Sequence, residues 1–250
     1  MVIFPITDEN NSDEPVSAWS AIEARLKQAA PAYWLVTQPS HAVLAGDLAA
    51  ALRPDIFGPI DETIARAIAL HDAGWSMHDA EQIQRLRSDP KQRPSSFLDA
   101  NTDQFLRAWT ASIDTAQKFA PIGGYLVSRH FDRLSYRVDS KGKSQLEAFR
   151  NREKQRQQKL RTPINLEDPA LVALVDALQF CDALSLYLCC GSAQTVKFET
   201  PRLSVSRRGD EYRLEPSPFV DHRQFSFSAL RHPVLTGKST QSGATFYINI

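Results

Sequence analysis

One apolar stretch, residues 170–190, constrains the fold of this chain more than any other feature of the sequence. It is rich in Leu, Ala, Val and Cys, yet it includes Asp176, Gln179 and Asp182. A helix inside a lipid bilayer would bear a high energetic cost for those polar groups. The preceding Pro169 is typical of the first turn of a helix. We therefore expect a long helix buried in the core of a folded domain.

The composition is that of an ordinary globular protein. Lys and Arg number 29 in the 250 residues, as do Asp and Glu, so the formal net charge is zero. A global basic field for nucleic acid is therefore excluded, although a local basic patch stays open. Residues 1–14 read as a polar arm and lack the charged start and apolar run of a signal peptide. The three cysteines all lie in the apolar stretch, which favours reduced thiols and a cytoplasmic location.

Helical spacing of apolar residues dominates residues 15–191. Ser40 and Asp61 are suitable N-caps for two of the helices. Residues 33–36 predict a short extended stretch, and residues 81–96 are polar with two prolines and predict a loop. The segments predicted as helices before the apolar stretch are 15–28, 41–52, 61–71, 103–118 and 121–134.

Residues 141–161 are polar and basic, with few apolar positions. A solvated helix is the simpler interpretation, because most runs of charge lie on exposed faces. The alternative is a strip that faces an anion near the active site.

After Gly191, alternation of apolar and polar residues replaces helical spacing. The segments VKFE, RLSVSRR, EYRLEP, FSFSAL and TFYINI have the period of two that is typical of strands, and Pro, Gly and Ser separate them. We therefore expect a mainly α protein. A helical domain would span residues 15–191, and residues 192–250 would form a small antiparallel β region packed on it.

Histidine and aspartate residues supply candidate metal ligands within the helical part. His71 and Asp72 are adjacent near the end of an apolar helix, and His41 opens an earlier one. Imidazole nitrogen together with carboxylate oxygen suits Fe, Mn, Zn, Co or Mg. A carboxylate at Asp182, inside the apolar stretch, is costly unless it is paired or bound to metal. Pairing with a core arginine is an equal alternative for Asp182.

The order H…HD…D resembles the HD superfamily of metal-dependent phosphohydrolases. More specifically, the chain is similar to an uncharacterised bacterial branch of that superfamily that carries a domain-of-unknown-function label. The resembling stretches are QPSHAVLAGDLA (38–49), ALHDAGWSMHDAE (69–81), FLDANTDQFLRAW (97–109), YLVSRHF (125–131) and ALQFCDALSLYLCC (177–190). The resemblance implies an HD-domain-like helical bundle with four metal ligands, which are His41, His71, Asp72 and Asp182.

The resemblance also implies roles for neighbouring residues. Asp72 would orient the attacking water and act as its general base. His130 lies where some HD enzymes place an extra histidine, and His130 or Arg129 would stabilise the charge on the phosphoryl group. Trp75 would form a wall of the pocket, and Asp79 would orient a ligand histidine. Core packing explains Trp75 slightly better, and a surface charge explains Arg129 better.

The implied activity is hydrolysis of a small or nucleotide phosphate ester, by a phosphomonoesterase or phosphodiesterase that uses a metal-activated water. We expect a divalent metal ion and a small phosphorylated substrate as partners, with neither a membrane nor a strong nucleic-acid contact, and a homodimer stays open. The alternative is a non-catalytic HD-like module that binds a metabolite or a protein. Its contact surface would be supplied by Phe219, Phe225 and Phe227.

Overall fold

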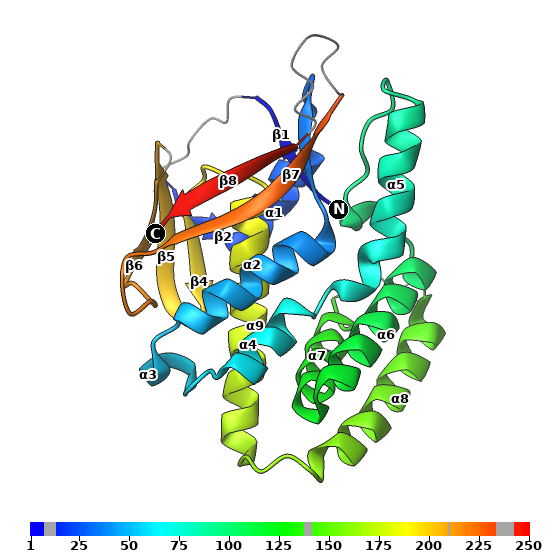
Figure 1. The fold of residues 1–250 in the computed structure, drawn as a ribbon, viewed down its shortest axis with the longest axis vertical. Coiled ribbons are helices and arrows are strands. Elements are labelled where there is room, and N and C mark those ends of the chain that lie inside the picture. The colour runs from blue at the N-terminus through cyan, green and yellow to red at the C-terminus, as the bar shows by residue number, and fades with distance from the viewer. Residues whose placement is uncertain (8–13, 138–141, 210, 234–242) are drawn as a thin grey trace.

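The computed structural model describes residues 1–7, 14–137, 142–209, 211–233 and 243–250. Its helices fill the middle of the chain, and its strands come from both ends (Figure 1). The helices are α1 (Ala18–Lys27), α2 (Gln38–Ala51), α3 (Pro54–Phe57), α4 (Glu62–Ala69), α5 (Ser76–Ser88), α6 (Thr102–Phe119), α7 (Pro121–Leu134), α8 (Lys143–Arg161) and α9 (Asp168–Cys189). The strands are β1 (Val2–Pro5), β2 (Val16–Ser17), β3 (Tyr33–Val36), β4 (Val196–Glu199), β5 (Arg202–Arg208), β6 (Glu211–Glu215), β7 (Gln224–His232) and β8 (Gly243–Asn249).

The strands form one curled, mixed sheet in the order β1-β3-β7-β8-β6-β5-β4-β2. Adjacent strands of this sheet are antiparallel, apart from the parallel pairs β2–β4 and β6–β8. Strand β3 connects the N-terminal part of the sheet to its C-terminal part, because it pairs with β1 on one side and with β7 on the other. Tyr33 lies opposite His232, and Leu35 lies opposite Leu230.

This sheet shows that the prediction of a mainly α fold with a small C-terminal antiparallel region is wrong. The five strands predicted after Gly191 are present as β4 to β8, and the extended stretch 33–36 is β3, but β1 and β2 join the same sheet. Strand β1 occupies part of the predicted polar arm, of which residues 8–13 lie outside the described residues. Strands β1 and β3 have four residues each and are largely buried on both faces. Short strands of this kind lack the alternation that reveals a half-exposed strand.

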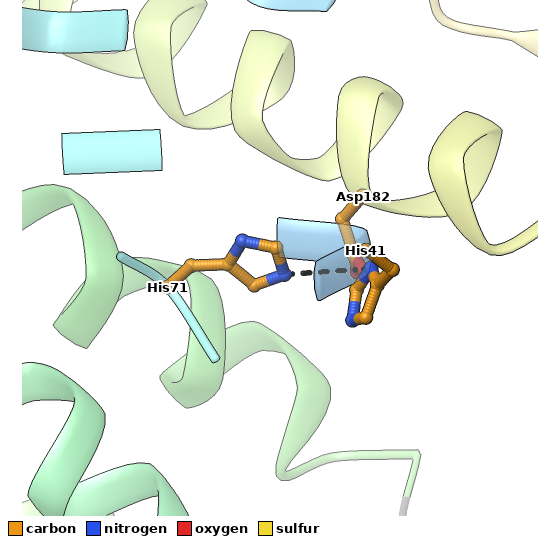
Figure 2. Close-up of side chains that lie close together, drawn as sticks. All are labelled: His41, His71 and Asp182. Carbon is orange, nitrogen blue, oxygen red and sulfur yellow. Dashed lines mark hydrogen bonds and ion pairs between the residues drawn. The ribbon is translucent and has the colours of Figure 1, made fainter. Parts of the chain in front are cut away.

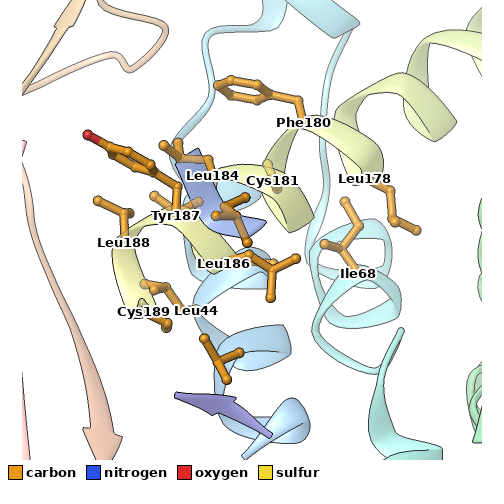
Figure 3. Packing of buried hydrophobic residues seen from close by; sticks show 14 of the residues in the cluster. Leu44, Ile68, Leu178, Phe180, Cys181, Leu184, Leu186, Tyr187, Leu188 and Cys189 are labelled. Atoms are coloured by element: carbon orange, nitrogen blue, oxygen red, sulfur yellow. The ribbon is translucent and has the colours of Figure 1, made fainter. Parts of the chain in front are cut away.

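Helices α2 and α9 lie between the sheet and the group formed by α6, α7 and α8 (Figure 1). Helix α9 packs against α1, α2, α3, α7 and β1, whereas α2 packs against α4, α9 and β7. Figure 3 shows the apolar side chains of α9, among them Leu178, Cys181 and Leu184, gathered near Leu44 of α2 and Ile68 of α4. All five of these side chains are fully buried. Apolar residues of α9, α2 and α4 thus form the core around the candidate metal centre.

Helix α9 is long and apolar enough to cross a membrane by length and composition alone, but 67% of its most apolar window is buried inside the protein. This is the environment of a core helix in a soluble globular domain. The carboxylates of α9 also face protein partners: Arg133 donates to Asp176, and His71 contacts Asp182. The apolar stretch is therefore the core helix that its polar residues predict.

The loop predicted for residues 81–96 is only partly present, because α5 continues to Ser88. This helix buries just Asp79 and Leu86, so its sequence shows little helical spacing of apolar residues. An i,i+4 pair between Arg85 and Glu81 lies on its exposed face.

Candidate metal centre

His41 lies in the first turns of α2, and its side chain is fully buried. The helix begins at Gln38, because the hydroxyl of Thr37 accepts a hydrogen bond from the Ser40 N–H at 3.2 Å. Thr37 is therefore the N-cap, in place of the predicted Ser40. Pro39 occupies the first turn, where it needs no N–H donor.

His71 and Asp72 lie in the turn that follows α4. The predicted cap at Asp61 is confirmed, since its carboxylate accepts from the Ile64 N–H at 2.8 Å. A 3₁₀ turn at Ala73–Trp75 then leads into α5. The Gly74 N–H donates to the Ser112 hydroxyl of α6 at 2.9 Å, and a Cβ added to Gly74 would lie 2.6 Å from the Ser112 nitrogen. Only glycine lets this turn pack directly on α6.

Side chains from these segments and from α9 meet at one point. The potential ligand atoms of His41, His71 and Asp182 all lie within 4.8 Å of one another (Figure 2). Nε2 of His71 is 3.3 Å from Oδ1 of Asp182 and 3.8 Å from Oδ2 of Asp72. Nε2 of His41 is 2.9 Å from Oδ2 of Asp72. Nε2 of His130, on α7, is 3.6 Å from Oδ2 of Asp182, so the structure brings together all five residues predicted as ligands or catalytic groups.

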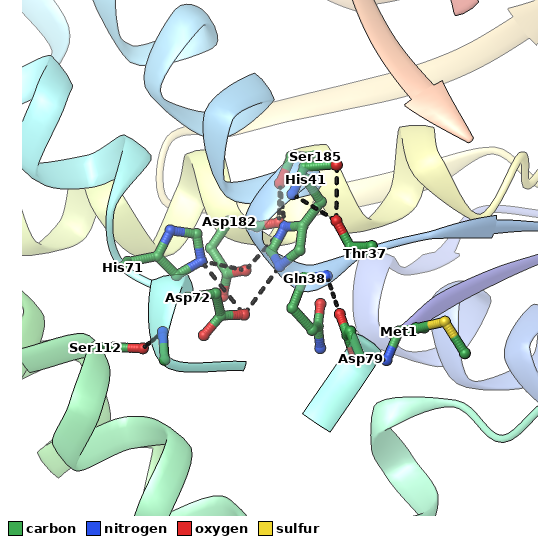
Figure 4. A network of polar contacts seen from close by, with 12 residues as sticks. Met1, Thr37, Gln38, His41, His71, Asp72, Asp79, Ser112, Asp182 and Ser185 are labelled. Carbon is green, nitrogen blue, oxygen red and sulfur yellow. Dashed lines mark hydrogen bonds and ion pairs between the residues drawn. The ribbon is translucent and has the colours of Figure 1, made fainter. Parts of the chain in front are cut away.

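Hydrogen bonds fix which nitrogen of each ring faces the carboxylates (Figure 4). Nδ1 of His71 lies 2.8 Å from the carbonyl oxygen of Ile68, which can only accept, so this nitrogen is the one that donates. The Ser185 hydroxyl donates to the Asp182 carbonyl at 2.8 Å, and it therefore accepts from Nδ1 of His41 at 3.0 Å. In both neutral rings Nε2 then carries no proton, and it faces a carboxylate oxygen. Two acceptors at such a distance require a proton or a metal ion that both can share.

The charges of the cluster shift the pKa values of its members. Burial alone would lower the pKa of His71, but the Asp72 and Asp182 carboxylates outweigh it and raise the pKa to about 9. Burial alone would raise the pKa of Asp182, whereas the neighbouring histidines, His71 first, lower it to about 2. Burial lowers the pKa of His130 to about 4, and the charge of Asp182 offsets this only in part. At neutral pH and without a bound cation, His71 is therefore protonated and His130 is neutral.

A pocket of about 740 Å³ opens beside the cluster and is lined by Asp72, His130 and Asp182. Its size lies in the range of sites for small molecules. Nδ1 of His130 is buried and has no hydrogen-bond partner among the described residues. The rest of the lining is rich in aromatic side chains. It includes Trp19, Trp75, Phe97, Phe105, Trp109, Phe131, Phe180 and Phe198.

Three predicted neighbours of the site occupy different places. Trp75 is buried and lines the pocket, so the core-packing and pocket-wall interpretations hold together. Asp79 contacts none of the histidine ligands; its carboxylate accepts from the Gln38 N–H at 2.6 Å, and it thereby supports the start of α2. Arg129 points toward α8, where it donates to Gln157 at 3.4 Å, and it does not line the pocket.

Helix α8 contains nearly all of the basic segment 141–161, whose residue 141 lies outside the described residues. It buries Leu146, Phe149, Glu153 and Gln157 and packs on α6 and α7. No described residue of this segment lines the pocket. The structure thus favours a helix with one solvated face over a strip at the active site.

Sequence reasoning missed Ser185, which holds His41 in place. The available signal was a hydroxyl residue three positions after Asp182 in an otherwise apolar helix, and so on the same face of α9. The aromatic surface proposed for the non-catalytic alternative is not exposed, because Phe219, Phe225 and Phe227 are all buried.

A family model described as a protein of unknown function, DUF3891, matches residues 26–231. The chain belongs to the DUF3891 family. The stretch matched to DUF3891 contains every residue of the cluster and most of the pocket, although the description assigns the family no activity. No match to the chain was found among curated proteins or among solved structures. The resemblance of this DUF3891 member to the HD superfamily therefore stays a hypothesis.

Proposed function

We propose that this protein is a metal-dependent phosphohydrolase of the HD type, a phosphomonoesterase or phosphodiesterase. One observation supports this most directly: four buried or half-buried ligand side chains converge at the end of a pocket of substrate size. A helical core without a polar function has no need of such groups, since each costs free energy to bury.

The donor set fits a divalent cation. It consists of His41, His71, Asp72 and Asp182, and the Nε2 atoms of both histidines face carboxylate oxygens. A cation held by these four side chains would satisfy both pairs of acceptors. Two imidazoles together with carboxylates favour Fe, Mn, Zn or Co over Mg, and His130 offers one more nitrogen near Asp182.

A divalent cation bound there would supply Lewis acidity, which lowers the pKa of water and polarises a phosphoryl oxygen. Asp72 lines the pocket and accepts the proton of the attacking water. His130 is neutral, so its ring donates one hydrogen bond to a phosphoryl oxygen while the other nitrogen accepts. The aromatic side chains beside these groups would lower the local polarity, which strengthens both contacts.

We also propose that the protein works in the cytoplasm. All three of its cysteines are buried thiols. Thiols of this kind suit a reducing compartment.

Metal analysis tests the proposal. The protein would be purified through a tag without histidines, reconstituted with Mn or Fe, and assayed for bound metal and for hydrolysis of aryl phosphates. We expect about one metal ion per chain and metal-dependent turnover in the wild type, and neither in Asp182→Asn. The matched control is Asp168→Asn, which removes an exposed carboxylate from the same helix.

Bound metal without turnover on any phosphate ester would support the non-catalytic module instead. Absence of metal after reconstitution would overturn the proposal for both the centre and the activity.

A further inference from the structure

The lining of the pocket contrasts with what a highly charged substrate needs. Eight aromatic side chains line it, and Trp75 and Trp109 are almost fully buried. Arg137 is the one positively charged side chain among the described lining residues, and it is exposed. Four lining residues are acidic, namely Asp72, Asp176, Asp182 and Glu199. The pocket thus offers much apolar area and very little positive charge.

These features limit how much negative charge a ligand can bring. One phosphate group can be neutralised by the proposed cation and by a hydrogen bond from His130. Further phosphates would lie among carboxylates and aromatic rings, where burial of an unpaired charge is costly. Nucleoside triphosphates and other polyphosphates are therefore disfavoured.

We propose, building on the phosphohydrolase assignment above, that the substrate is an ester with a single phosphate group and an apolar, uncharged organic part. The phosphate would lie against Asp72, His130 and Asp182, and the organic part would lie against Trp75, Phe105 and Trp109. The rings of Trp75 and Phe105 meet edge to face at 5.4 Å, and those of Phe105 and Trp109 lie 5.4 Å apart, so the three form a continuous wall. Flat apolar groups bind to walls of this kind.

Binding of the organic part can be measured without metal or turnover. Three of the four tryptophans, Trp19, Trp75 and Trp109, line the pocket, so intrinsic fluorescence reports on its occupancy. We expect saturable quenching by 1-naphthol in the metal-free protein, and no comparable change with glucose. Phe105→Ala should weaken 1-naphthol binding about tenfold. The control is Phe119→Ala, at the exposed end of the same helix, which should leave binding unchanged.

Kinetics on the reconstituted enzyme test the substrate class. We expect kcat/KM for 1-naphthyl phosphate to exceed that for glucose 6-phosphate or ATP by at least about 100-fold. Across a series of n-alkyl phosphates, each methylene buried in the pocket should raise kcat/KM by about fourfold.

The two proposals fail in different ways. A higher kcat/KM for glucose 6-phosphate or ATP, or a kcat/KM that does not depend on alkyl length, would overturn the proposed substrate class. Either result would leave the proposal of a phosphohydrolase unaffected. Quenching by 1-naphthol without turnover of any ester would support the apolar pocket and reject the hydrolase. An absence of quenching in the wild type, or equal binding in Phe105→Ala and Phe119→Ala, would reject the apolar site itself.

Discussion

The hydroxyl oxygen of Ser185 lies 3.0 Å from Nδ1 of His41, although 144 residues separate them. The same hydroxyl donates to the carbonyl of Asp182, one turn earlier in α9. It thereby connects the ligand on α2 to the ligand on α9, and it sets which nitrogen of His41 faces Asp72.

Replacement of Ser185 by alanine should therefore weaken metal binding without removing a ligand. Partners of this kind typically contribute a factor of about 10 to 100 in metal affinity. We expect a loss of that size in Ser185→Ala, measured by competition with a chromogenic chelator for Zn or Mn. Ser88→Ala is the control, because Ser88 lies on the exposed face of α5. Equal affinity in the two variants would show that the hydroxyl does not orient His41.

Asp72→Asn should reduce turnover much more than substrate binding. The carboxamide keeps the size of the side chain but cannot accept a proton from water, so kcat should fall by about 10² to 10⁴. The measurement is kcat and KM for 1-naphthyl phosphate, with the bound metal of the variant determined alongside. Asp114→Asn, which removes a half-exposed partner of Arg156 on α6, serves as the control. A variant with wild-type kcat would exclude Asp72 as the general base.

Gly74→Ala should destabilise the protein by about 1–3 kcal/mol, as expected when an extra carbon is forced into a packed contact. The added Cβ would lie 2.6 Å from the Ser112 nitrogen and 2.9 Å from the Ala111 Cβ, so the turn that carries Asp72 must move away from α6. Urea unfolding measures the loss. Gly243→Ala is the matched control, because its nearest neighbour would lie at 3.5 Å. Equal stabilities for the two variants would contradict a close approach at Gly74.

Asp79 should stabilise the protein at neutral pH and lose this effect at strongly acidic pH. Burial alone would raise its pKa, but the amino group of Met1, 3.0 Å away, and the Gln38 N–H hold the pKa below its usual 3.8. A carboxyl with a lowered pKa contributes stability above its unfolded value, and that contribution is lost as the pH falls through the folded value. We expect Asp79→Asn to lose about 3 kcal/mol at neutral pH, since it breaks a buried ion pair.

Urea unfolding at several pH values checks this expectation. The difference between wild type and Asp79→Asn should shrink as the pH falls below 3.8. The exposed Asp103, changed to asparagine, should give no such difference.

The candidate site was easier to predict from the sequence than the fold around it. His71, Asp72 and Asp182 are polar groups among apolar neighbours, and their burial costs free energy unless they pair with one another or bind a metal ion. That argument needs no knowledge of the path of the chain. Arg129 and His130 show its limit, because adjacent residues of one helix point to different faces, and only the structure shows which of them meets Asp182.

The sheet could not be predicted in full, because its edges depend on contacts between distant segments. Val2 pairs with Val36, and Val16 pairs with Val196, but neither short strand alternates visibly. The strands after Gly191 have one solvated face, which imposes the period of two that made them recognisable. Strand β1 has no such face, and its four residues therefore fall inside the segment predicted as a polar arm.

The pairing of Tyr33 with His232 has a consequence for how the molecule is made. Strand β3 is second from one edge of the sheet, but its neighbour β7 is synthesised after all the helices that the structure describes. The helices from α2 to α9 form contacts that are closer in sequence, and such contacts close at a lower entropic cost. We therefore expect the histidine cluster to assemble on the ribosome before the sheet closes. Amide hydrogen exchange pulsed during refolding would then protect α9 earlier than β3.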